Sequence, residues 1–426
     1  MEITHDPSEY IKGIQQLLIS DKKRIGFLFG AGSSMAKKNN DSLTVPSVWP
    51  LTNEIVNELS VAKEEYKVLF EELKEELVNN FNIETILSNL EQKVNIVGKG
   101  SLNGLNKLGF EGLIKEYKRK IQEKISIHNE FTYEKAESMI QVDFARWVGQ
   151  VDRKYPIEIF TTNYDYLFEL GLEYCNVPYY DGFSGGYKPF FNSESIEDMN
   201  FLPTQTKLWK VHGSLGWQLE EESKKIIRTN SNGDDILIYP SILKYNNSKK
   251  QPYEGLMDRL SNFLKRDDSI LIACGYSFGD EHINARIETA LKTNTTAHVV
   301  FLYFDKYWCK TSSCYKFRLD ENDKLYKSAM SNSKISVYGI RGAVIGGKYG
   351  EWKLKNEPDI DDTVNVVLYF DEEFDDSKEQ IGEEEKGTEQ WSGKGDFTLT
   401  DFSKLTEFLL SLMSGNEILT WSKNAK

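Results

Sequence analysis

A repeated pattern constrains the fold of this chain most strongly: a short, mostly apolar run ends abruptly in small or polar residues. The pattern occurs at Ile25–Phe29, Ile157–Thr161, Lys207–Val211 and Ile270–Cys274. Short apolar runs bounded by turn-forming residues are typical of buried strands in a parallel sheet. Because parallel α/β sheets bind ligands at the carboxyl ends of their strands, the residues that follow these runs are candidates for a site. The sequence therefore predicts an α/β fold with a functional edge.

Two of the four runs are followed by glycine-rich turns. The first turn contains Gly30, Ala31, Gly32, Ser33 and Ser34, and the second contains Gly275, Tyr276 and Ser277. A glycine turn that opens a helix offers backbone N–H groups to a phosphate, and two such turns facing one crevice would suit a dinucleotide. A purely structural tight turn is an equal interpretation of Gly30–Ser34. Neither turn has the full G-x-G-x-x-G pattern of dinucleotide-dependent hydride transfer or the G-K-[ST] of a P-loop. The sequence therefore disfavours a hydride-transfer enzyme and an NTPase.

The other two runs are followed by polar side chains. Asn163 and Asp165 come after Thr161, and His212 comes directly after Val211. Asn163 is either a site residue or a turn former, and Asp165 is either a site residue or a helix cap. His212 is either a packed structural histidine or a base, since an unperturbed imidazole has a pKa of roughly 6.5.

Further polar residues follow the second glycine turn. Asp280, His282 and Asn284 could bind a ribose, or they could cap and start the next helix. The residues alone leave both interpretations open.

Composition excludes several classes of protein. With 426 residues, of which 39% are hydrophobic, the chain can bury the cores of two or three domains. The apolar runs are too short to span a membrane and no secretory signal pattern is present, which predicts a soluble, cytoplasmic protein. A formal net charge of -14 disfavours direct nucleic-acid binding. The four cysteines contain no C-x-x-C pair, so we expect no metal site of the four-thiolate zinc kind and no disulfide scaffold.

The predicted strands group into a main domain. Residues 1–340 hold these strands, and at about residues 51–147 they are interrupted by a helical insertion with apolar residues three and four apart. We expect a helix at Tyr164–Tyr174, directly after the second apolar run, and a hairpin turn at Asn232–Asp234. The insertion is long enough to cover the functional edge of the sheet.

Residues 341–426 are predicted to form a small C-terminal α+β extension. Val364–Phe370 has the apolar pattern of a strand, and Phe402–Met413 has that of an amphipathic helix. Between them, residues 371–389 hold ten acidic residues against two lysines. Such a charge balance is typical of a solvated loop.

Taken in order, the motifs resemble the sirtuin superfamily. The resemblance is carried by Gly30-Ala-Gly-Ser, Thr161-Thr-Asn163-Tyr-Asp165, His212-Gly213 and Gly275-Tyr-Ser277, and it covers roughly residues 20–340. It implies an α/β fold with a Rossmann-like parallel sheet and NAD⁺ as the substrate. By this resemblance, Gly30–Ser34 would hold the diphosphate of NAD⁺, and Gly275–Ser277 would contact its adenosine half.

The same resemblance implies roles for the polar residues. Asn163 and His212 would be catalytic: Asn163 would position the nicotinamide ribose and a water, and His212 would act as a base on the ribose hydroxyls. Asp165 would line the nicotinamide pocket. The remaining members of the predicted NAD-binding set are Thr162, His282 and Asn284.

The chain departs from deacetylating sirtuins in several places. Those enzymes carry four zinc-binding cysteines after the catalytic histidine, whereas residues 213–273 contain no cysteine. They also have a glutamine where Thr162 stands, and the element of their acyl-peptide groove is missing around Ile238–Tyr253. These differences disfavour protein deacylation and predict a protein without zinc. The motifs are more similar to the zinc-free branch found in bacterial antiphage systems, whose members hydrolyse NAD⁺ to ADP-ribose and nicotinamide.

The function that this resemblance implies is an NAD⁺ hydrolase that depletes NAD⁺ in antiphage defence. Members of about this length are often paired with a HerA-type ATPase, so we expect a homo-oligomer that assembles with such a partner. Two alternatives remain: a non-catalytic subunit that senses NAD⁺ or ADP-ribose, and a nuclease-associated subunit of an ATPase complex.

Overall fold

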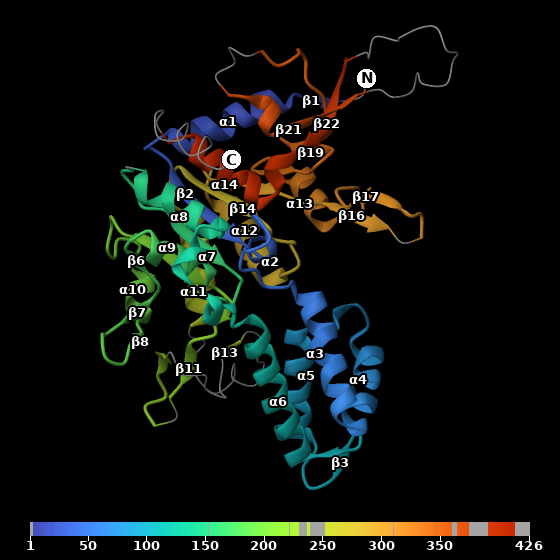
Figure 1. The fold of residues 1–426 in the computed structure, drawn as a ribbon. Coiled ribbons are helices and arrows are strands. Elements are labelled where there is room, and N and C mark those ends of the chain that lie inside the picture. Colours follow the sequence, from blue (N-terminus) through green and yellow to red (C-terminus); the bar gives the residue numbers. More distant parts are fainter. Residues whose placement is uncertain are drawn as a thin grey trace. The chain divides into compact units, whose positions relative to one another are not determined.

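The computed structural model describes residues 3–151, 153–220, 222–229, 237–238, 252–309, 311–359, 364–374 and 391–413. The chain divides into two units (Figure 1). Unit 1 consists of Met1–Leu28, Gln150–Ile157 and Leu264–Lys426. Unit 2 consists of Phe29–Gly149 and Glu158–Phe263. The predicted turn at Asn232–Asp234 lies outside the described residues.

Unit 1 contains parallel strands of a large sheet. Strands β14 (Ser269–Cys274), β15 (His298–Leu302) and β18 (Ile335–Tyr338) pair in parallel. Strands β19 (Gly342–Ile345) and β20 (Lys348–Trp352) add antiparallel neighbours. With β1 (Thr4–His5) and β2 (Arg24–Phe29), the order is β1-β20-β19-β18-β15-β14-β2. The predicted α/β class with a mostly parallel sheet is confirmed. The domain boundary at residue 340 stays a prediction, although β18 and β19 pair with each other across it.

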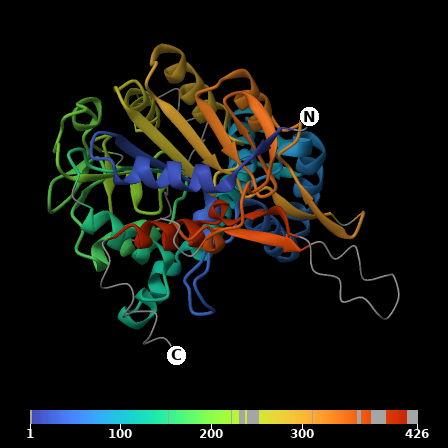
Figure 2. The same cartoon turned by 90° about the horizontal axis from the view of Figure 1, so that it is seen from above.

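Helices of unit 1 begin at capped positions. Helix α1 (Pro7–Ile19) starts with proline after Asp6, whose carboxylate accepts the backbone N–H of Ser8 at 3.0 Å. Figure 2 shows α1 running across the strands of unit 1. The other helices are α12 (Glu281–Thr293), α13 (Lys324–Ser331) and α14 (Phe402–Ser411).

The C-terminal part of unit 1 differs from the sequence prediction. A 3-10 helix, η4 (Val366–Leu368), lies where a strand was expected, and the strand β21 begins only at Phe370 (Phe370–Phe374). It pairs with β22 (Trp391–Phe397), so residues 371–374 are not part of a solvated loop. The reason is the buried pair Phe370 and Phe397, which are 1% and 0% exposed. The remaining acidic residues, 375–389, lie outside the described residues.

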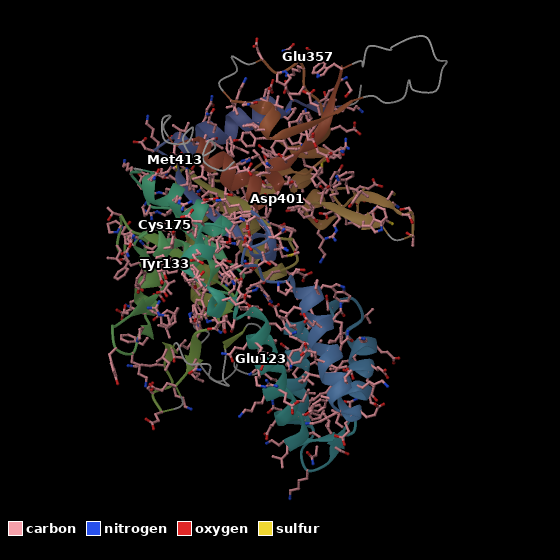
Figure 3. The ribbon with its side chains drawn as sticks, viewed as in Figure 1. Glu123, Tyr133, Cys175, Glu357, Asp401 and Met413 are labelled. Carbon is pink, nitrogen blue, oxygen red and sulfur yellow. The ribbon has the colours of Figure 1, made fainter. Side chains whose placement is uncertain are left out.

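Unit 2 is built around three parallel strands. They are β5 (Glu158–Thr161), β9 (Thr206–Lys210) and β6 (Tyr179–Tyr180), in the order β5-β9-β6. Helices α7 (Tyr133–Ala136), α8 (Ile140–Gln150), α9 (Leu167–Tyr174) and α11 (Tyr253–Leu264) belong to this unit. Figure 3 shows Tyr133 and Cys175 near each other, where α7 meets the end of α9. The ring centroids of Tyr133 and Tyr174 lie 5.5 Å apart.

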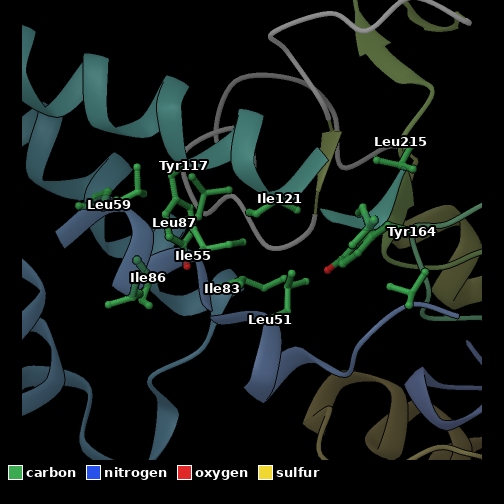
Figure 4. Packing of buried hydrophobic residues seen from close by; sticks show 14 of the residues in the cluster. Leu51, Ile55, Leu59, Ile83, Ile86, Leu87, Tyr117, Ile121, Tyr164 and Leu215 are labelled. Carbon is green, nitrogen blue, oxygen red and sulfur yellow. The ribbon is translucent and has the colours of Figure 1, made fainter. Parts of the chain in front are cut away.

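The helical insertion of unit 2 has a core of its own. It comprises α3 (Val48–Ala62), α4 (Glu64–Leu77), α5 (Ile83–Ile96) and α6 (Lys107–Ile125). Their apolar faces pack into one cluster that also includes Tyr164, in the loop after β5, and Leu215, directly after β10 (Figure 4). The insertion is therefore packed against the predicted functional edge.

The remaining elements are short. They are α2 (Ala31–Met35), α10 (Ser193–Glu197), β3 (Ser101–Leu102), β4 (Leu105–Asn106), β7 (Phe183–Ser184), β8 (Phe190–Phe191), β10 (Gly213–Ser214), β11 (Trp217–Leu219), β12 (Ile226–Arg228), β13 (Leu237–Ile238), β16 (Lys306–Cys309), β17 (Cys314–Phe317), η1 (Val78–Asn80), η2 (Ile127–Glu130) and η6 (Thr398–Thr400). Among the described residues, no helix combines the length and the apolar character needed to cross a membrane.

A buried ion pair ties α11 to β5. Arg259 is 1% exposed, and its guanidinium donates to both carboxylate oxygens of Glu158, at 2.8 and 3.0 Å. The same guanidinium donates to the carbonyl oxygens of Ile196 and Asp198, and the indole N–H of Trp209 donates to Glu158 at 2.8 Å. Both charged groups have hydrogen-bond partners, so removal of Arg259 or of Glu158 would leave the other residue as a buried, unpaired charge.

We expect Arg259→Ala to lower the free energy of unfolding by about 3–5 kcal/mol, because Glu158 would lose its buried counter-ion. Urea unfolding followed by far-ultraviolet circular dichroism measures the change. Lys324→Ala is the matched control, because it breaks an ion pair of equal length, 2.8 Å, on the exposed surface. A midpoint for Arg259→Ala no lower than that of the control would contradict the prediction.

Candidate functional site

The pairing of β5 with β9 brings the two predicted catalytic residues to one edge. Thr161 stands opposite Lys210 in the parallel register. Asn163 and His212 each follow two residues later, so both leave the sheet at the same level. The backbone N–H of Val211 continues the pairing by donating to the carbonyl of Thr161 at 2.9 Å. The predicted common edge is thus present within unit 2.

Asn163 is held by the first glycine turn. Its amide nitrogen Nδ2 donates to the carbonyl of Gly30 at 3.0 Å and to the hydroxyls of Ser33 and Ser34 at 3.1 and 2.7 Å. Its backbone N–H donates to Oγ1 of Thr161 at 3.1 Å. The side chain is 8% exposed, and these bonds fix its orientation. The structure therefore brings together residues 30–34 and Asn163.

Asp165 belongs to the same network. Ser34 donates its hydroxyl to Oδ2 of Asp165 at 2.7 Å, and the backbone N–H of Leu167 donates to Oδ1 at 3.0 Å. The second bond forms a turn just before α9, whose N-cap is Tyr166, so α9 starts at Leu167 and not at Tyr164 as predicted. Asp165 thus links the glycine turn to the start of α9. Thr162 lies beside it, with its backbone N–H bonded to the carbonyl of Phe29 at 3.0 Å.

Lys210 fixes the loop that carries Asn163 and Asp165. Its buried ammonium donates to the carbonyl of Tyr164 at 3.2 Å and to that of Asp165, and it pairs with Glu169 at 2.8 Å. Burial raises the pKa of the Glu169 carboxyl, and the charge of Lys210 opposes this rise. The ion pair therefore lets Lys210 remain inside the unit while it clamps the loop.

A close helix contact supports the glycine turn. At Gly171, an added Cβ would lie 2.6 Å from the carbonyl oxygen of Gln141, so only glycine lets α9 approach α8 this closely. Gln141, 1% exposed, then donates its side-chain N–H to the carbonyl of Ser33 at 2.7 Å. The two helices thereby hold α2 in place beneath Asn163.

The helical insertion contributes Glu84 to the site. Asn82 caps α5 by accepting the backbone N–H groups of Glu84 and Thr85 at 3.0 Å each, and the hydroxyl of Thr85 accepts the backbone N–H of Asn82 at 3.2 Å. The backbone N–H of Ile83 donates to the hydroxyl of Thr52 at 3.0 Å. These contacts fix Glu84 in the first turn of α5, where a carboxylate is favoured by the helix dipole.

One carboxylate oxygen of Glu84, Oε1, lies close to both Tyr164 and His212 at the sheet edge. The hydroxyl of Tyr164 donates to Oε1 of Glu84, and Nδ1 of His212 lies 3.6 Å from the same oxygen. The rings of Tyr164 and His212 are tilted neighbours, with centroids 6.5 Å apart. A carboxylate facing Nδ1 favours the tautomer protonated there, which makes Nε2 the basic nitrogen of His212.

Three residues of this site were not predicted from the sequence: Glu84, Gln141 and Lys210. The capping-box pattern Asn82-x-x-Thr85 could have indicated that a helix begins beside Glu84. Nothing in the sequence indicated that this helix meets His212. Lys210 precedes the motif by two residues, and its charge within an apolar run was the only signal.

The second glycine turn belongs to unit 1 and is a self-contained structure. Gly275 has a φ of +65°, which glycine adopts without strain. The hydroxyl of Tyr276 donates to Oδ1 of Asn284 at 2.9 Å, and Nδ2 of Asn284 donates to the carbonyl of Phe278 at 2.9 Å. Asn284 thus stabilises the turn from inside.

The other polar residues in and after this turn either cap α12 or are exposed to solvent. Asp280 caps α12 through the backbone N–H groups of His282 and Ile283, as one of the two interpretations predicted. The side chains of Ser277 and His282 are exposed. A crevice shared by this turn and Gly30–Ser34 stays a prediction.

The arrangement in unit 2 combines a fixed amide, a histidine and a carboxylate. An amide whose N–H₂ group is fully engaged presents its carbonyl oxygen in a defined direction, and a histidine backed by a carboxylate can accept a proton. Such a set can orient a water and polarise a hydroxyl of a bound ligand. Among the described residues, no three His, Cys, Asp or Glu side chains are grouped as metal ligands.

Comparison with known proteins adds one match. No curated protein matches the chain. Residues 157–326 match the family model of the SIR2-like domain. The matched segment contains Asn163, His212 and the turn at Gly275, whereas Gly30–Ser34 and Glu84 precede it. The model covers less than half of the chain, and over this segment the chain is similar to a SIR2-like domain.

Proposed function

We propose that this chain is an NAD⁺ glycohydrolase that cleaves NAD⁺ to ADP-ribose and nicotinamide. The observation that carries the proposal is the constellation of Asn163, His212 and Glu84, formed at the ends of two paired strands and the start of α5. The SIR2-like match over residues 157–326 gives the expected substrate class. We place the diphosphate at Gly30–Ser34.

The rest of the NAD⁺ molecule is assigned by the same resemblance. We propose that Thr162 lies near the nicotinamide ribose and that Gly275, Tyr276 and Ser277 contact the adenosine half. His282 and Asn284 belong to this second group. For Asn284 we propose an indirect role, because its amide is engaged within the turn.

The reaction requires little beyond placement and charge stabilisation. The nicotinamide of NAD⁺ is a pyridinium that departs as a neutral molecule, so no general acid is needed, unlike in ordinary glycosidases with their two carboxylates. The bond from the anomeric carbon to the nicotinamide nitrogen breaks with both electrons going to nitrogen. Water then forms the new bond at that carbon and releases one proton to the solvent. The enzyme must therefore support an oxocarbenium-like centre and hold a water close to it.

The residues of unit 2 suit these two tasks. The amide N–H₂ of Asn163 is engaged by Gly30, Ser33 and Ser34, so we assign its carbonyl oxygen to the attacking water. His212, oriented by Glu84, accepts a hydrogen bond or a proton from the 2′- or 3′-hydroxyl of the ribose. This raises the electron density at the anomeric centre. Asp165 acts through Ser34 as a positioning residue.

We expect Asn163→Ala and His212→Ala each to reduce nicotinamide release by roughly a hundredfold or more, since each removes a positioned polar group of the reaction. Chromatography of nicotinamide and ADP-ribose measures the rate, with the protein alone and with the proposed HerA-type ATPase. Asn129→Ala, at an exposed position of the same unit, is the control.

Two outcomes would count against this mechanism. Cleavage by either variant at the unmodified rate would exclude the assigned residue. Intact NAD⁺ after long incubation of the complete assembly would instead favour a subunit that senses NAD⁺ or ADP-ribose without turnover.

Glu84 and Tyr164 provide a second test. Glu84→Gln keeps the shape of the side chain and an acceptor for Tyr164 but removes the charge facing His212, so we expect kcat to fall at least about tenfold with little change in KM. Tyr164→Phe removes the other bond to the same oxygen and leaves the charge, so we expect a smaller effect on kcat. Equal losses in both variants would indicate a structural role for Glu84.

We further propose that NAD⁺ consumption serves antiphage defence and that the chain acts as a homo-oligomer with a HerA-type ATPase. The support is the resemblance of the motifs to the zinc-free antiphage branch. Light scattering on the purified chain, alone and mixed with the ATPase, should give masses of several subunits. A monomer mass in both samples would contradict this part of the proposal.

A further inference from the structure

Two cysteines face each other across a hairpin of unit 1. Figure 1 shows β16 and β17 as a two-stranded hairpin that extends away from the rest of this unit. In the antiparallel register of the hairpin, Cys309 stands directly opposite Cys314. Both are free thiols; Cys314 is exposed and Cys309 is partly exposed.

The register provides the geometry that a disulfide needs. Residues directly opposite in an antiparallel pair lie on the same face, with Cα atoms about 4.5 or 5.5 Å apart. A disulfide requires a Cα separation of roughly 4.4–6.8 Å, so either kind of pair fits. The two thiols can therefore join without a shift of the strands, and the aromatic pair Trp308 and Tyr315 next to them, with centroids 5.0 Å apart, holds the strands together.

The surroundings of Cys309 favour the reactive thiolate. Hydrogen bonds from Ser312 and Thr311 lower the pKa of Cys309 to about 6. The thiolate is the form that attacks oxidants. The other two cysteines contrast with this, because burial raises the pKa of both Cys175 and Cys274.

We propose that Cys309 and Cys314 form an oxidation site that a peroxide converts into a cross-strand disulfide. This inference does not depend on the proposed NAD⁺ chemistry. Cys309 is the attacking thiol, because the hydrogen bonds from Ser312 and Thr311 stabilise its thiolate, whereas the thiol of Cys314 donates to Ser312 at 3.2 Å; Cys314 is the resolving thiol.

The chemistry balances with one molecule of hydrogen peroxide. The thiolate of Cys309 attacks one peroxide oxygen, the O–O bond breaks, and the leaving hydroxide takes up a proton to become water. The resulting sulfenic acid of Cys309 is attacked by the sulfur of Cys314, which forms the S–S bond and releases a second water. Two thiols lose two electrons in total, and the peroxide is reduced by two electrons.

The sequence of the hairpin allows a direct test. Trypsin cleaves after Lys306, Lys310 and Lys316, so Cys309 and Cys314 fall in separate peptides, 307–310 and 311–316. The full reduced chain is treated with an equimolar amount of hydrogen peroxide, alkylated under denaturing conditions and digested. We expect mass spectrometry to find these two peptides joined. On a denaturing, non-reducing gel the oxidised protein should run as a single chain, and its intact mass should fall by the mass of two hydrogen atoms.

Single substitutions separate the two steps. In Cys314→Ser, the reaction should stop at the sulfenic acid of Cys309, which dimedone traps, and in Cys309→Ser the cross-link should disappear. Cys175→Ser is the control and should keep the link, since Cys175 lies in unit 2 at the end of α9 (Figure 3). Unlinked peptides after oxidation, or disulfides between two chains, would overturn the proposal.

Discussion

The parallel pairing of β5 with β9 is the constraint on which the candidate site depends. It sets Thr161 opposite Lys210, and Asn163 and His212 then leave the sheet together. Lys210 contributes to the pairing and to the site: its backbone lies in the pairing of β5 with β9, and its ammonium binds the loop that follows β5. A one-residue slip of this pairing would turn the side chain of Lys210 to the other face. The register of these two strands therefore determines the geometry of the candidate site.

A satisfied polar network surrounds this edge. Buried polar groups are costly unless each finds a partner, and Asn163, Ser34 and Asp165 find theirs in one another. The network joins three stretches of chain that are far apart in sequence: the turn after β2, the loop after β5 and, through Gln141, helix α8. Hydrogen bonds of this kind hold the side chain of Asn163 in one orientation.

The sequence predicted those features that depend on residues close together in the chain. Strands, the helical insertion and the residues at the strand ends were predictable from periodicity and turn chemistry. Glu84 was not, because its role depends on where α5 lies in space and not on any residue near it in sequence. The strand β21 was also missed, because its acidic residues suggested a loop and the buried pair of Phe370 with Phe397 was not apparent from the sequence. Long-range packing escaped prediction in both cases.

The placement of Glu84 makes the helical insertion part of the candidate site. Helix α5 packs with α3 and α6 in a core that reaches Tyr164 and Leu215 at the sheet edge. A small displacement of these helices would change the distance between Glu84 and His212, now 3.6 Å, long before the core came apart. Ligand or protein contacts on the outer surface of the insertion that shift α5 would therefore change the surroundings of His212.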